Sequence, residues 1–222
     1  MHNALLLIGS PKPRGSTSES LGTCLMQGLA TRGWTTTQLN IRRQLKSQAE
    51  TDILWITMDR ADLIVIAFPL YVDSLPAPVI RMMEKFKARG DRTAALKTQS
   101  LAVIINCGFP ENAHNAIAER ICHRFAAEMR LTWAGCLSMG EGGALGGKPI
   151  VARGLTRPLA AALDSAAAAL AAGRPIPPEA VALMAKPIIA PNLYLLAAKI
   201  GWWQAAWKNR VLTRLAARPY IT

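Results

Sequence analysis

The chain has 222 residues, 51% of them hydrophobic, which is enough for one α/β domain with an extension. It contains no run of about 18 apolar residues and no apolar segment with a basic leader, so we expect neither a transmembrane helix nor a signal peptide. Its formal net charge of +12 favours anionic partners and argues against a small acidic electron carrier.

The four cysteines and the charge distribution narrow the class of protein further. Cys24, Cys107, Cys122 and Cys136 form no CxxC pair, so we expect reduced thiols in a cytoplasmic protein and no metal site. The positive charge is uneven, because residues 180–222 contain six basic residues and no acidic one.

The apolar pattern predicts alternating strands and helices along the chain. The predicted strands are residues 4–8, 34–40, 63–68, 101–105 and 131–138. The predicted helices are residues 17–31, 53–58, a segment that starts near Pro76, 112–129 and 155–172. Ser16 and Glu19 have the spacing of a capping box before the first helix. In the helix at 112–129 the residues expected to face inward are Ile117, Ile121, Cys122 and Phe125.

Five strands with intervening helices predict a doubly wound parallel α/β sheet. Right-handed crossovers place the carboxyl ends of all strands at one edge, where ligands bind. The loops after the first, third, fourth and fifth strands are therefore the candidate site. A proline-rich segment at 174–178 predicts a boundary between a domain of residues 1–174 and a helical tail of residues 175–222.

The first of these loops, residues 9–18, combines glycines, hydroxyl side chains and two cations before a helix. Free N–H groups and the positive end of the helix dipole favour a phosphate there. The loop has neither the P-loop nor the GxGxxG pattern, and its hydroxyl groups fit a single terminal phosphate such as that of FMN. The alternative is a polar turn in which Ser16 is an ordinary helix cap. The candidate phosphate ligands are Ser10, Lys12, Arg14, Ser16, Thr17 and Ser18.

The loops after the third and fourth strands have the residues expected around a flat ring. Tyr71 can stack on such a ring, and Gly108 allows the backbone to approach it closely. The alternative for the loop after the third strand is a proline-bounded loop with a partly buried tyrosine. In the loop after the fourth strand, Cys107 is interpreted as a small residue at a strand end rather than a redox thiol. The candidate ring contacts are Pro69, Leu70, Tyr71, Val72, Asn106, Cys107 and Gly108.

The remaining polar features point to no catalytic side chain. The loop at 140–147 contains five glycines and is interpreted as either a mobile lid over a ligand or a solvated loop. The three histidines have no serine and acid arranged around them, so a hydrolase triad is not supported.

Three motifs together resemble the flavodoxin-like NAD(P)H-dependent FMN reductase family over about residues 4–150. They are Gly9-Ser10-Pro11…Gly15-Ser16-Thr17, then Ala61-Asp62…Pro69-Leu70-Tyr71…Leu75-Pro76-Ala77-Pro78, then Cys107-Gly108-Phe109-Pro110-Glu111. The resemblance implies a strand order of 2-1-3-4-5, bound FMN, NAD(P)H as co-substrate, a small electron acceptor such as a quinone or a flavin, and a homodimer. Ser16 stands where asparagine is frequent in that family, and Val72 stands where a second aromatic residue is frequent.

Two other classes of function remain open at this stage. One is a flavodoxin-like binding or regulatory module without nicotinamide activity. The other is a protein that acts through its basic tail.

The tail has a stripe of bulky apolar residues at helical spacing together with several cations. We expect the tail helix to run from Pro191 to about Ala217 and to dock on its own core or on a second subunit, or alternatively to contact an anionic membrane surface. The tail has no nucleic-acid-binding motif, so no nucleic-acid partner is expected. The stripe consists of Leu193, Leu196, Ile200, Trp203 and Trp207, and the cations are Lys199, Lys208, Arg210, Arg214 and Arg218.

Overall fold

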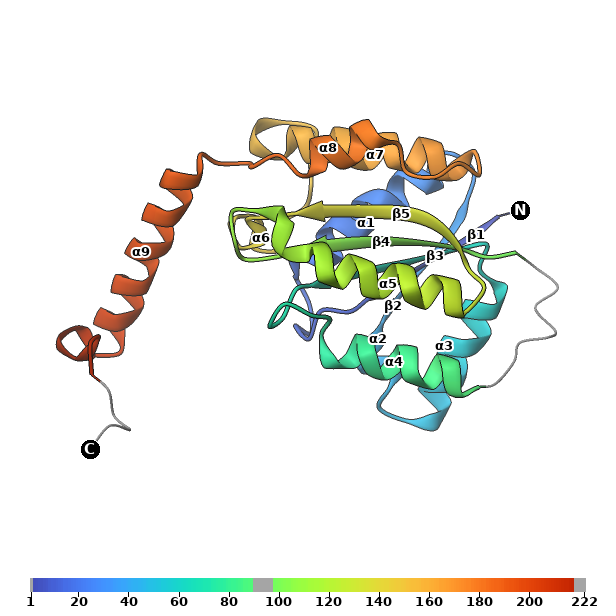
Figure 1. Cartoon of the computed structure of the whole chain (residues 1–222), viewed down its shortest axis with the longest axis horizontal. Helices are drawn as coiled ribbons and strands as arrows, with labels where there is room; N and C mark the ends of the chain where they lie inside the picture. Colours follow the sequence, from blue (N-terminus) through green and yellow to red (C-terminus); the bar gives the residue numbers. More distant parts are fainter. Residues whose placement is uncertain (1, 90–97, 218–222) are drawn as a thin grey trace. The chain divides into compact units, whose positions relative to one another are not determined.

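The computed structural model describes residues 2–89 and 98–217, so Arg218 lies outside the described residues. Its centre is a five-stranded parallel sheet in the order β2-β1-β3-β4-β5, which confirms the predicted fold class (Figure 1). The strands are β1 (Asn3–Ile8), β2 (Thr35–Asn40), β3 (Leu63–Pro69), β4 (Ser100–Asn106) and β5 (Thr132–Met139).

Helices cover both faces of this sheet. One face packs against α1 (Thr17–Ala30), α7 (Arg157–Ala171) and α8 (Pro178–Met184). The other face packs against α3 (Gln48–Arg60), α4 (Ala77–Ala88) and α5 (Ala116–Glu128). The short elements are α2 (Ile41–Gln44), α6 (Gly142–Leu145) and the 3-10 turns η1 (Asn112–Asn115) and η2 (Gly154–Thr156).

The alternation of side chains along each strand explains why the central strands are apolar throughout. In β1, Leu6 and Ile8 face the core below α1 and α7, whereas Leu5 and Leu7 face the core below α3 and α4. All four are buried, as expected of a parallel sheet with helices on both faces. The sheet therefore rigidly positions the loops at its carboxyl edge.

The start of α1 confirms the predicted capping box. The Ser16 hydroxyl accepts a hydrogen bond from the Glu19 N–H at 3.1 Å, and the Glu19 carboxylate reaches back to the Ser16 N–H at 3.4 Å. These two bonds fix the point at which the first loop becomes a helix.

Three predictions about helices are wrong in detail. Ile117 and Ile121 are exposed, and the inward face of α5 consists of Ala118, Cys122, Phe125 and Ala126, so the predicted Cys122 and Phe125 are confirmed. The short helix predicted at 53–58 is the longer α3, which begins earlier because the Ser47 hydroxyl caps it. The tail helix α9 (Pro191–Lys208) ends nine residues before the predicted Ala217.

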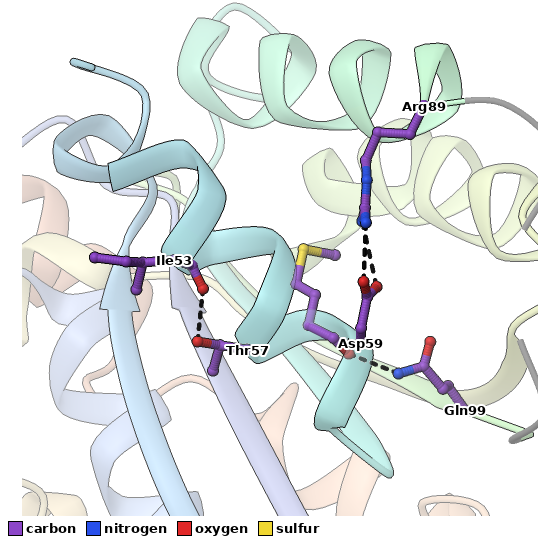
Figure 2. Close-up of polar contacts among 6 residues, drawn as sticks. Ile53, Thr57, Asp59, Arg89 and Gln99 are labelled. Carbon is purple, nitrogen blue, oxygen red and sulfur yellow. Dashed lines mark hydrogen bonds and ion pairs between the residues drawn. The ribbon is translucent and has the colours of Figure 1, made fainter. Parts of the chain in front are cut away.

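The carboxyl end of α3 is fixed at the amino edge of the sheet, opposite the candidate site. Figure 2 shows the Gln99 side-chain amide donating to the Met58 carbonyl at 2.6 Å. The Arg89 guanidinium binds the Asp59 carboxylate with both terminal nitrogens, at 3.3 and 2.9 Å. A two-point arginine–carboxylate contact is geometrically specific, so it ties α4 to α3.

The chain divides into two compact units, residues 1–188 and 189–222. The first includes α8, which packs on α7 and on β5, and the second contains α9 and the 3-10 turn η3 (Leu212–Arg214). Among the described helices, none is both long and apolar enough to cross a bilayer.

Candidate functional site

The candidate site is the carboxyl edge of the sheet, where β1 and β3 lie side by side. The chain leaves β1 for α1 on one face and leaves β3 for α4 on the other face. Two adjacent parallel strands whose connections diverge in this way form the switch point at which doubly wound folds bind ligands. The predicted site residues follow β1, β3 and β4 at this edge.

The loop after β1 offers hydroxyl groups and cations. Ser10 and Ser16 are buried to 4% and 5% exposure, and each hydroxyl accepts a backbone hydrogen bond, from Lys12 and Glu19 respectively. Within the described contacts neither hydroxyl donates, so each proton is available to a phosphate oxygen. Lys12 and Arg14 are exposed beside them and can neutralise the charge of a phosphate. The donor set of this loop therefore fits an anion.

A carboxylate already binds the N–H groups that a phosphate would use. Glu19 Oε2 accepts from the Gly15 N–H at 2.8 Å and from the Ser16 N–H at 3.4 Å. An anion that enters this loop must therefore compete with Glu19 for these donors and is repelled by its charge. This makes Glu19 part of the candidate site, in a role opposite to that of Lys12 and Arg14.

The other two predicted hydroxyl ligands connect this loop to its neighbours. Thr17 Oγ1 donates to the Gly142 carbonyl at 2.7 Å, and Ser18 Oγ donates to Asn106 Oδ1 at 2.7 Å. Both hydroxyls are buried, so in this structure they join the loops after β1, β4 and β5. Their role as direct phosphate ligands stays a prediction.

The loop after β3 is a tight turn that exposes two predicted ring contacts. Tyr71 and Ser74 exchange both backbone hydrogen bonds at 3.0 Å, and the residues between them, Val72 and Asp73, have φ of 50° and 56°. Positive φ at both central positions is the geometry of a type I′ turn, which is unfavourable for a β-branched residue. Tyr71 is 50% exposed and Val72 is 98% exposed. The turn therefore presents an aromatic and an aliphatic surface to a ligand.

The base of the same loop is held against β4. Pro69 ends β3, and the N–H of the buried Leu70 donates to the Asn106 carbonyl at 2.8 Å. Asn106 is itself buried, with its side chain on Ser18. These three predicted contacts therefore lie at the base of the exposed turn, and Asn106 links them to the loop after β1.

The loop after β4 contains a buried thiol and an exposed glycine. The Cys107 N–H donates to the Met139 carbonyl at 3.1 Å, and the Cys107 carbonyl accepts from the Gly142 N–H at 2.8 Å. Burial raises the pKa of the Cys107 thiol, which agrees with its interpretation as a small residue at a strand end. Gly108 is exposed, and a Cβ there would meet no atom within 4 Å. Phe109 is 51% exposed and packs on His114 with ring centroids 4.3 Å apart.

The glycine-rich loop after β5 packs tightly against the other two loops. A Cβ at Gly147 would collide with the Gly15 carbonyl, and a Cβ at Gly142 would lie 2.7 Å from Asn106 Nδ2. Glu141 is completely buried, and its carboxylate accepts from the Ile188 N–H at 2.6 Å. The loop therefore packs against its neighbours at Gly142 and Gly147, whereas Gly143, Ala144 and Gly146 are exposed to solvent. Its interpretation as a mobile lid stays a prediction.

Sequence reasoning missed two side chains that act on the first loop. Arg42 Nη1 donates to the Pro11 carbonyl at 3.0 Å, which adds a cation from the neighbouring β2 side. The sequence contained a signal for this, since Arg42 is the second residue after β2, and β2 is next to β1 in the predicted strand order. Glu19 was identified as a cap but not as a competitor for the loop N–H groups.

Comparison with known proteins identifies the fold. A scan against models of protein families and a search of curated proteins find no match. Among solved structures, an NAD(P)H:quinone oxidoreductase from Methanothermobacter marburgensis is 17% identical with a TM-score of 0.56, over 76% of this chain and 95% of that one. An FMN-dependent NADH-azoreductase from Bacillus anthracis, in complex with FMN, is 12% identical with a TM-score of 0.55, over 77% and 100%.

A third structure of similar fold is that of a larger protein. Rubredoxin oxygen:oxidoreductase from Desulfovibrio gigas is 10% identical with a TM-score of 0.52 over 78% of this chain, and this chain spans 36% of its length. At these identities the similarity shows the fold, and the chain has a flavodoxin-like fold with strand order 2-1-3-4-5.

Proposed function

We propose that this chain is an FMN-dependent oxidoreductase that accepts hydride from NADH or NADPH and passes electrons to a small acceptor such as a quinone or a flavin. The observation that supports the proposal is that a loop whose hydroxyl groups and cations fit an anion lies at the β1/β3 switch point together with the turn that exposes Tyr71. Two proteins of similar fold are named as an NAD(P)H:quinone oxidoreductase and an FMN-dependent NADH-azoreductase, which supports the same reaction class. We further propose that the protein is a cytoplasmic homodimer.

In this proposal the two ends of FMN have separate binding groups. Ser10, Lys12, Arg14, Ser16, Thr17 and Ser18 hold the phosphate, and the ring lies against Pro69, Leu70, Tyr71, Val72, Asn106, Cys107 and Gly108. When bound, FMN supplies the hydride acceptance and the electron transfer. The side chains named here bind and orient it, while the packed loop after β5 supports their positions.

A pair of cap substitutions tests the phosphate assignment. Ser16 and Ser47 both cap helices by accepting an N–H three residues on, but only Ser16 lies in the candidate site. We expect Ser16→Ala to weaken FMN binding about tenfold, because a hydrogen bond to a charged group is lost, whereas Ser47→Ala should leave it unchanged. The measurement is a fluorescence titration of flavin-free protein with FMN. Equal affinities of Ser16→Ala and wild type would argue against the assignment.

A second experiment separates an enzyme from an electron carrier or an empty module. Reconstituted protein is mixed with NADH or NADPH, and nicotinamide absorbance is followed with and without a soluble quinone. The proposal predicts that the protein oxidises NADH or NADPH, and that this oxidation becomes catalytic when the quinone is added. Flavin binding without nicotinamide oxidation would instead identify a carrier, and no flavin binding would identify a module of another kind.

A further inference from the structure

The C-terminal unit has its own defined structure, and the inference drawn from it is independent of the proposed function. Helix α9 ends in a Schellman motif, in which the Val211 N–H donates to the Ala206 carbonyl at 2.9 Å and the Arg210 N–H donates to the Trp207 carbonyl at 3.0 Å. Arg210 adopts the left-handed conformation that this motif needs, with φ of 57°. The chain then continues into η3, and Ala206 is buried at the turn.

The bulky apolar residues of this unit are exposed to solvent. The stripe of Leu193, Leu196, Ile200, Trp203 and Trp207 has exposed fractions from 50% to 74%. At 100° per residue these five side chains share one side of α9, and the opposite side carries the small Ala198 and Ala205 together with the exposed Leu195 and Trp202. Burial of such a stripe is strongly favourable, so the unit has the form of a binding surface.

The charge of the same segment determines what kind of surface it can bind. Residues 189–222 hold five cations and no acid, and the remaining 188 residues also have a net positive charge. Contact between the tails of two copies would bring like charges together, which is unfavourable. The stripe therefore needs a partner that is apolar and negatively charged at once.

An anionic lipid membrane has both properties. Tryptophan prefers the boundary between lipid headgroups and acyl chains, and lysine and arginine side chains reach the phosphates above it. Lys199 and Lys208 lie on either side of the stripe, and Arg210 and Arg214 follow the helix. Since no described helix is long and apolar enough to cross a bilayer, such a contact would lie in the plane of the surface.

We propose that residues 189–217 bind the surface of an anionic membrane, with the α9 stripe inserted at the headgroup level and the flanking cations on lipid phosphates. The chain offers a matched control, because Trp202 is 78% exposed, adjacent to Trp203, and off the stripe. Comparing substitutions of Trp202 and Trp203 therefore separates the effect of the stripe on membrane binding from the effect of removing a tryptophan.

The test is sedimentation of the full chain with phosphatidylcholine vesicles that contain either no or about one third phosphatidylglycerol. We expect at least about tenfold tighter binding to the anionic vesicles, reduced by salt. Trp203→Ala should weaken this binding about tenfold, and Trp202→Ala should change it less than about threefold. Far-UV circular dichroism checks that each variant folds.

Three results would overturn the proposal. They are absence of binding to the anionic vesicles, equal binding to both vesicle types, and equal losses for the Trp202 and Trp203 variants. Tail-dependent self-association in size-exclusion chromatography without vesicle binding would assign the stripe to a second copy of the chain instead.

Discussion

At the scale of single residues, Glu19 is the side chain with the clearest expected effect on FMN affinity. Its carboxylate holds the Gly15 and Ser16 N–H groups, so an incoming phosphate meets both a competitor and a like charge. Glutamine can keep the capping hydrogen bonds without the charge. Glu19→Gln should therefore bind FMN about three to ten times more tightly than wild type at low salt.

Riboflavin provides the control for this prediction, because it has the same ring and lacks the phosphate. Parallel fluorescence titrations should show no change in riboflavin affinity in Glu19→Gln. If riboflavin and FMN gain equally, Glu19 acts on the ring or on the fold rather than on the phosphate.

The four thiols give a second prediction at this scale. Burial raises the pKa of Cys122 to about 12, and it also raises the pKa values of Cys24, Cys107 and Cys136. Because only the thiolate reacts and a raised pKa keeps the thiol protonated at pH 8, the native protein should react slowly. A chromogenic disulfide reagent should label half-buried Cys24 slowly in the native state and should label the other three thiols only in denaturant. Rapid native labelling of Cys107 would contradict its interpretation as a structural residue.

At the scale of elements, the strands and α1 were predictable because their signals are local. The apolar runs of β1, β3 and β4 and the Ser16–Glu19 spacing need no knowledge of the rest of the fold. The inward face of α5 was only partly predictable, because the small Ala118 and Ala126 face inward while the more hydrophobic Ile117 and Ile121 are exposed. The loop contacts were not predictable either, since Thr17 and Gly142 are 125 residues apart and only the folded sheet brings them together.

The packed loop after β5 gives a prediction at this scale. Gly146 and Gly147 both have positive φ, but only a Cβ at Gly147 would collide with the Gly15 carbonyl. Gly147→Ala should therefore lower the free energy of unfolding by roughly 1–3 kcal/mol more than Gly146→Ala, and it should weaken FMN binding through Gly15. Urea unfolding of both variants measures the difference. Equal losses of unfolding free energy in the two variants would mean that the loop accommodates a Cβ at residue 147 without a steric penalty.

At the scale of the whole molecule, the fold and the chemistry rest on different observations. The sheet order and the two-sided core establish the flavodoxin-like fold, while the proposed reaction depends on the loops at one edge. Folds of this kind host many functions, so the functional conclusion depends on the residues of the site and not on the fold. The C-terminal unit raises a separate question, because its charge and exposed tryptophans are the observations behind the membrane proposal.

The central claim is that the carboxyl edge of the sheet binds FMN with its phosphate in the loop after β1. The most direct measurement is a crystal structure of the protein with saturating FMN. We predict density for the phosphate against Ser10, Gly15 and Ser16, with the ring against Tyr71 and Gly108 and the Glu19 carboxylate moved off the Gly15 N–H. Flavin density at any other place on the molecule, or none at saturation, would contradict the claim.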